Sequence, residues 1–223
     1  MGEVYSRLGR YIEADMYGFQ EVQYIIDNSL DNCSHNLLKI LVSLGRGEVL
    51  LRNKELKKAK ESLSETIEIA EKLTGEDDND AMLARAFKIE AQIRLGEFEE
   101  AYKDCCFTFN VKRKAYTNFS DLMYITCFYH AAFIKYKQGD FKRSLGHFSD
   151  FFRQMKLFCH LFLDEKDYKN IEQKGVFQEA VYQDSQSLQI IKECLQRSLI
   201  VFTAIYGSSH PFVKDYVVEN CNV

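Results

Sequence analysis

The stretch Leu95-Gly96-Glu97-Phe98-Glu99-Glu100-Ala101 combines a glycine, an aromatic residue two positions later and a small residue three positions after that. Glycine ends a helix readily because it enters the left-handed backbone conformation without strain. The aromatic side chain fills the space between two helices, and the small residue lets the second helix cross the first closely. The stretch therefore predicts the turn of a helical hairpin.

The same pattern recurs along the chain at a nearly constant interval. With the small residue taken as the anchor, the equivalents of Ala101 are Ala14, Ala59 and Ser144, at intervals of 45, 42 and 43 residues. A degenerate fifth anchor, Ile191, follows 47 residues after the fourth. A period of this length indicates a stack of helical hairpins.

Apolar residues with helical periodicity flank each turn, and no segment shows the alternation of a strand. The runs before the turns are 36–52, 81–95 and 121–137, and those after them are 56–73, 98–111, 141–161 and 188–206. The sequence thus predicts an all-α chain forming one domain, 1–223, of about five hairpins: 1–33, 34–77, 78–117, 118–163 and 164–209. The fifth should be irregular, because the charged stretch 164–169 and Gly175 interrupt the spacing.

The anchored pattern resembles the tetratricopeptide repeat (TPR) family, with the extended repeat of its kinesin-light-chain subgroup. The first repeat matches the family's small, aromatic, glycine, aromatic and alanine positions with Gly2, Tyr5, Gly9, Tyr11 and Ala14. The subgroup tends to close its second helix with a glycine sixteen residues after the anchor, often before a His-Pro pair; the matching residues are Gly75, Gly207, His210 and Pro211. The resemblance implies a right-handed α-α superhelix. Since both ends fall inside expected helices, we expect a fragment of a longer array or ends that a partner covers.

Composition excludes several classes of protein. A formal charge of -4 gives no basic field for nucleic acid. No secretory signal or 18-residue uncharged stretch is present, so we expect no membrane span. The seven cysteines are an odd number without a disulfide framework. We therefore expect reduced thiols and a cytoplasmic location.

In the TPR family the first helix of each pair lines a groove that holds an extended peptide. Seven residues before the anchors stand Arg7, Arg52, Arg94 and Lys137, and eleven residues before them stand Glu3, Glu48, Glu90 and Phe133. Stacking would align the basic residues into a ladder that binds carboxylates. Alternatively, the first three Glu/Arg couples are i,i+4 pairs that only stabilise their own helices.

The fourth repeat lacks this pairing, because Phe133 takes the place of the glutamate. Tyr129 and Tyr136 lie on neighbouring turns, so an aromatic and cationic surface could contact a ligand there. Core packing between helices is the competing interpretation. The resulting candidate peptide-binding residues are Arg52, Glu90, Arg94, Tyr129, Phe133, Tyr136 and Lys137.

No catalytic or metal-binding pattern is visible. The chain has no Ser/His/Asp order, phosphate-binding glycine loop or H-E-x-x-H motif. Cys33/His35 and Cys159/His160 each lack a second pair at zinc-ligand spacing. We therefore predict a non-catalytic scaffold without metal or cofactor that binds a peptide or protein segment in its concave groove. The alternative is a peptide-sensing module attached to a separate effector domain; a third possibility, an enzyme within the solenoid, would need a buried ionisable cluster.

Overall fold

The computed structural model describes residues 32–114, 122–178 and 186–222, so the predicted first hairpin lies almost wholly outside the described residues. The described residues form helices and short connections without a strand, which confirms the all-α prediction. The chain divides into two compact units, Met1–Tyr116 and Thr117–Val223. The prediction of a single domain of five repeats stays a prediction.

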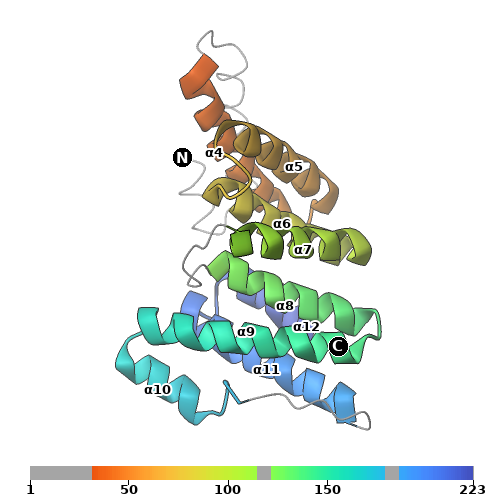
Figure 1. Cartoon of the computed structure of the whole chain (residues 1–223), viewed down its shortest axis with the longest axis vertical. Coiled ribbons are helices and arrows are strands. Elements are labelled where there is room, and N and C mark those ends of the chain that lie inside the picture. Colours follow the sequence, from red (N-terminus) through yellow and green to blue (C-terminus); the bar gives the residue numbers. More distant parts are fainter. Residues whose placement is uncertain (1–31, 115–121, 179–185, 223) are drawn as a thin grey trace. The chain divides into compact units, whose positions relative to one another are not determined.

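The first unit contains two helical hairpins (Figure 1). Helices α4 (Asn32–Arg52) and α5 (Leu56–Leu73) form one hairpin, and α6 (Asn79–Leu95) and α7 (Phe98–Lys114) form the other. Helix α6 packs against both helices of the first hairpin. The core of the first unit is made of leucine, isoleucine and alanine side chains: Leu44, Leu50, Leu51, Ala59, Leu63, Ile67, Ala84 and Ala91.

The second unit is built around one long hairpin, α8 (Leu122–Lys137) and α9 (Phe141–Phe162). The short helix α10 (Glu165–Gln173) and the longer α11 (Ser187–Tyr206) pack against α9. A π-helical turn, η3 (Phe212–Val217), then leads directly into α12 (Val218–Cys221) and packs against α11. The core here is aromatic: the fully buried Tyr129 ring has the rings of Phe148, Phe151, Phe202 and Tyr216 at centroid distances of 5.2–6.4 Å.

The predicted hairpin turns share one backbone geometry. The residue five positions before each anchor has a positive φ: 64° at Lys54, 78° at Gly96 and 77° at Gly139. In each turn the amide of this residue donates to the carbonyl three residues earlier, and the next amide donates to the carbonyl five residues before itself, at 2.9–3.1 Å. These bonds satisfy carbonyls left open at the end of the first helix. The three segments therefore end their first helices by the same device.

The anchors lie where the two helices of a hairpin cross. Ala59, Ala101 and Ser144 are all fully buried. The Ser144 hydroxyl donates to the Ala132 carbonyl at 2.8 Å, so the α8 and α9 backbones are close at this point. In the first described hairpin, a Cβ added to Gly47 would lie 2.6 Å from the Leu63 side chain. Small residues are needed because the helices approach closely.

The connections after α5 and α11 also share a geometry. Gly75 and Gly207 have φ values of 108° and 85°, and each accepts a hydrogen bond from the amide three residues later, at 3.3 Å. That later residue then accepts from a backbone amide of the following helix: Asp78 Oδ1 from Asp80 at 2.9 Å, and His210 Nδ1 from Phe212 at 3.3 Å. The glycines predicted to close second helices do so at both places.

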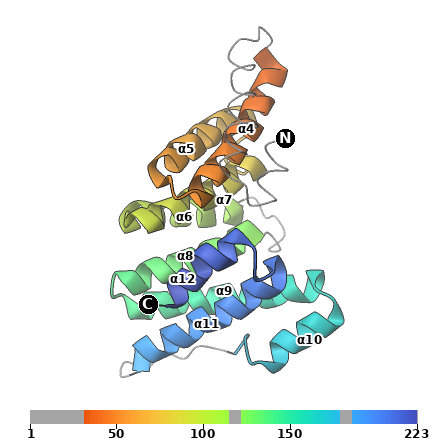
Figure 2. The ribbon, with the colours of Figure 1, turned by 180° about the vertical axis from the view of Figure 1, so that it is seen from behind.

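The segment after α9 departs from the hairpin pattern. Helix α10 has only nine residues, and the element whose side chains bond to α8 is η3–α12. His130 Nδ1 lies 2.9 Å from the Tyr216 hydroxyl, and Asn220 Nδ2 donates to the Tyr129 hydroxyl at 3.2 Å. In Figure 2, α12 lies in front of α8. A later segment of the chain therefore covers the face of α8 that α10 would cover in a regular stack.

Candidate functional site

Two predicted ladder residues of the first unit, Arg52 and Arg94, form a buried ion network with Glu90, whereas Glu3 and Arg7 lie outside the described residues. Arg52 Nη1 of α4 lies 2.7 Å from Glu90 Oε1 of α6, and Arg94 Nη2 lies 3.1 Å from the same oxygen. The side chains of Arg52 and Glu90 are each 1% exposed, and that of Arg94 is 10% exposed. One carboxylate thus joins two helices and neutralises positive charge between them.

Glu48 belongs to the same network. Burial raises the pKa of its carboxyl group, the positive charge of Arg52 acts in the opposite direction, and the negative charge of Glu90 raises it further. The Glu90/Arg94 ion pair confirms the predicted i,i+4 pairing within α6. The charged groups of Arg52, Glu90 and Arg94 are buried against one another, which supports the structural interpretation of these pairs; a role in peptide binding stays a prediction.

The aromatic residues predicted in α8 lie mainly in the core. The surroundings of Tyr129 support the competing interpretation, core packing: α9, α11 and η3 all contribute rings around it, and its hydroxyl bonds to Asn220. Phe133 is also buried, whereas Tyr136 is half-buried and Lys137 is exposed. The Lys137 ammonium lies 5.3 Å from the Phe133 ring centroid and 5.7 Å from that of Tyr136. Lys137 therefore already interacts with the aromatic rings of its own helix.

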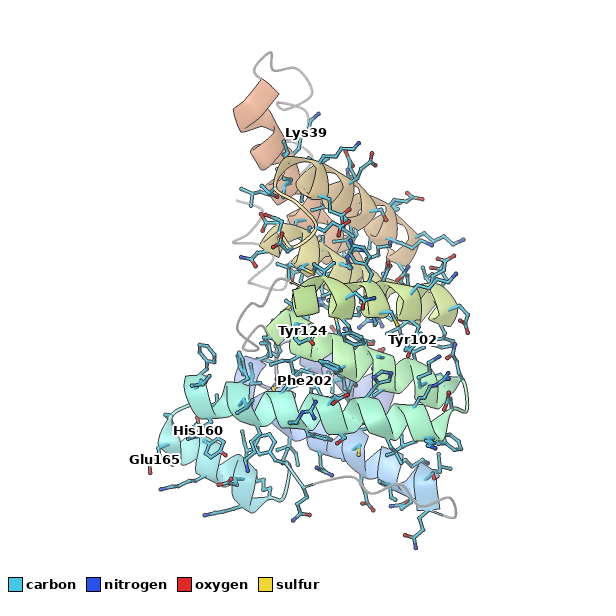
Figure 3. The ribbon with its side chains drawn as sticks, in the orientation of Figure 1. Lys39, Tyr102, Tyr124, His160, Glu165 and Phe202 are labelled. Carbon is cyan, nitrogen blue, oxygen red and sulfur yellow. The ribbon has the colours of Figure 1, made fainter. Side chains whose placement is uncertain are left out.

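A cleft in the second unit offers a different surface. It has a volume of about 570 Å³ and lies between α9, α10 and the segment 174–178. Its lining residues are Ser149, Phe152, Arg153, Lys156, Leu157, His160, Tyr168, Phe177 and Gln178. Figure 3 shows His160 between the end of α9 and the start of α10. We call this the α9–α10 cleft.

The walls of the α9–α10 cleft differ in chemistry. Arg153, Lys156 and His160 follow one another at i, i+3 and i+7, which puts them on one face of α9. Aromatic rings face them: Tyr168 of α10 stacks on Phe177 with centroids 6.2 Å apart. The His160 ring meets the Tyr168 ring edge-on at 5.2 Å. The cleft thus combines a basic wall with an aromatic wall.

Arg197 of α11 holds the segment behind the aromatic wall. Its Nε donates to the Val176 carbonyl at 2.7 Å, and its Nη2 donates to the Gln178 carbonyl. Its guanidinium also lies over the Phe152 ring, 4.3 Å from the centroid. Two backbone bonds and a cation–π contact therefore fix 176–178 against α9 and α11.

The basic wall has only surface ion pairs. Arg153 Nη2 lies 2.5 Å from Asp150 Oδ1, and Lys156 Nζ lies 3.4 Å from Glu172 Oε1, which also accepts a hydrogen bond from the Tyr168 hydroxyl at 3.1 Å. All four charged side chains are well exposed to solvent. Exposed pairs contribute little and exchange partners easily, so a bound ligand can use both cations.

Three large apolar side chains near the end of α9 are exposed, and one of them, Leu157, lines the cleft. Leu157, Leu161 and Phe162, all in the last two turns of α9, are 53%, 66% and 61% exposed. The Phe162 ring packs only on Phe158 of its own helix among the ring contacts of the described residues, with centroids 4.7 Å apart. Neighbouring exposed apolar side chains of this size are typical of protein-interaction surfaces.

Buried thiols near the cleft are poorly suited to nucleophilic chemistry. Burial raises the pKa of Cys159 to about 12 and that of Cys194 to about 11. Both thiols are therefore protonated at neutral pH, and the thiolate is the reactive form. Among the described residues, no group of three or more histidine, cysteine, aspartate or glutamate side chains could hold a metal ion.

The exposed apolar residues of α9 could have been predicted from the helical periodicity of its sequence. The buried stripe of α9 is Ser144, Leu145, Phe148, Phe151, Phe152, Met155 and Cys159. Leu157 and Leu161 lie off this stripe, so their exposure follows from helical periodicity alone. The contribution of Tyr168 and Phe177 could not be predicted, because it depends on how α10 folds back on α9.

No protein-family model, curated protein or solved structure matches this chain. Within the part of the chain that the structure describes, no helix combines the length and apolar character needed to cross a bilayer.

Proposed function

We propose that the chain is a non-catalytic interaction module that binds a segment of a partner protein in the α9–α10 cleft. The observation that carries this proposal is the cleft itself, which joins a basic wall and an aromatic wall to the exposed side chain of Leu157. Its volume of about 570 Å³ is within the usual range of ligand sites, about 300–1,000 Å³. Aromatic and arginine side chains are enriched where proteins bind one another.

We also propose that the hairpins belong to a TPR-like right-handed superhelix. Three hairpin turns with the same backbone bonds, buried anchors at the crossing points and two equivalent glycine links support this proposal. The first helices α6 and α8 are buried along most of their length. We therefore assign partner binding to the α9–α10 cleft and not to a groove over the first helices.

The partner site can be tested with a pair of matched leucine variants. Leu157→Glu puts a charge into the lining of the cleft, and Leu188→Glu puts the same charge on α11 at another exposed leucine of the unit. Proteins captured from a lysate should be lost with Leu157→Glu and retained with Leu188→Glu. A purified partner should then bind the Leu157→Glu chain at least about tenfold more weakly. Identical capture and affinity for both variants would remove the cleft from the proposal.

A further inference from the structure

The geometry points to an acidic segment with an aromatic or large aliphatic anchor residue as the occupant of the α9–α10 cleft. This inference rests on the proposed function, because it names the chemistry of the partner segment at the same site. Three observations carry it: the sign of the charge in the lining, the spacing of the basic groups and the apolar floor.

The charge of the lining is opposite to that of the whole chain. The nine lining residues include three basic side chains and no acidic one, whereas the chain has a formal charge of -4. The acidic groups paired with the basic wall, Asp150 and Glu172, lie 2.5 Å from Arg153 and 3.4 Å from Lys156 but are not among the lining residues. A ligand carboxylate in the cleft would compete with these two exposed carboxylates for Arg153 and Lys156 and would also meet His160.

The basic groups are spaced for more than one carboxylate. From Arg153 to His160, the basic wall extends about 10 Å along α9 at 1.5 Å per residue. Acidic residues in an extended segment that point to the same side are separated by about 7 Å. Two such carboxylates can therefore reach the wall together, and the planar guanidinium of Arg153 can bind one of them in bidentate geometry.

The apolar floor and the aromatic wall of the cleft determine which kind of anchor side chain fits. Phe152 is buried below the cleft, and the stacked rings of Tyr168 and Phe177 form its far side. An aromatic or leucine side chain inserted here would contact three rings and lose its own exposure to water. The cleft volume accommodates a few side chains, so the occupant is a short segment of chain and not a folded surface.

Single-stranded nucleic acid is the main competitor, because it also uses cations and aromatic stacking. The exposed Leu157 in the lining favours a peptide, since it offers an apolar contact and no donor to a phosphate.

The test is an NMR titration of the whole chain with a capped peptide, Glu-Glu-Phe-Leu-Glu-Glu, and two analogues. One analogue replaces every glutamate by glutamine, and the other replaces Phe-Leu by Ser-Ser. The parent peptide should shift amide signals of α9, α10 and 174–178. Each analogue should bind about tenfold more weakly.

Matched lysine variants locate the charge effect. Lys156→Gln should weaken binding of the parent peptide about threefold. Lys142→Gln, an exposed lysine at the start of the same helix, should leave binding unchanged. Equal binding of the glutamine analogue at the cleft would overturn the acidic preference but leave the cleft as a partner site. Tighter binding of a uridine decamer than of the parent peptide at these residues would overturn both this inference and the proposed function.

Discussion

Replacing Glu90 by glutamine tests whether the predicted ladder is structural. The substitution keeps the size of the side chain and removes the negative charge that Arg52 and Arg94 share through one oxygen atom. Because these groups are buried between α4 and α6, water cannot replace the lost carboxylate without opening the helix packing.

The size of the effect follows from the burial of the ion network. Removing one partner of a buried ion pair typically costs about 3–5 kcal/mol. The glutamine oxygen can still accept a hydrogen bond from one guanidinium, so we expect the lower end, about 3 kcal/mol. With a urea dependence of about 1–3 kcal/mol per M, the unfolding midpoint should fall by about 1–3 M.

Urea unfolding followed by circular dichroism measures this shift, and Glu68→Gln is the matched control. Glu68 pairs with Lys72 on α5 at 2.6 Å, but both side chains are largely exposed. The control should leave the midpoint unchanged, because solvent already screens the pair. Normal stability of Glu90→Gln together with weakened partner binding would refute the structural assignment and restore the ladder as a ligand site.

Three further predictions concern burial and backbone geometry. Burial lowers the pKa of His130 to about 3, below its ordinary value of 6.5. At pH 5 the imidazole therefore binds a proton in the unfolded chain but not in the folded one. The free energy of unfolding should be about 2 kcal/mol lower at pH 5 than at pH 7. In His130→Gln, urea midpoints at the two pH values should lack this difference, and an equal difference would contradict the assignment. Gly47→Ala should cost about 1–3 kcal/mol because its methyl group meets Leu63, whereas Gly146→Ala, with open space around it, should be neutral or slightly stabilising by thermal unfolding. Lys54→Gly should raise the melting temperature, with a gain of about 1 kcal/mol, since φ is 64° there; a lower melting temperature would count against the strain argument.

The hairpin turns could be predicted because their determinants are local. Gly96 and Gly139 supply the positive φ, and the anchors five residues later fit the helix crossing. Lys54 shows that the turn can form without glycine at this position. It adopts the same conformation without being glycine, because the same two backbone hydrogen bonds form around it.

The burial of the predicted site residues could not be read from local sequence. The contacts that bury Tyr129 and His130 come from Asn220 and Tyr216, 91 and 86 residues further along the chain. Similarly, Arg52 and Glu90 are 38 residues apart, and a recurrent charge fits both a ligand ladder and a bridge between helices. Only the distance between α4 and α6 distinguishes these interpretations.

The break in the period coincides with the proposed binding surface, the α9–α10 cleft. In a regular stack, each helix is covered by the next hairpin and leaves little apolar surface exposed. Helix α9 has 22 residues and is about 33 Å long, whereas α10 has nine residues and is about 13 Å long. Since α10 is too short to cover α9, the basic face and the leucines of the last turns of α9 remain open. The charged stretch 164–169 interrupts the repeat in the sequence and begins the short helix α10. It is therefore the sequence feature that leaves this face of α9 uncovered.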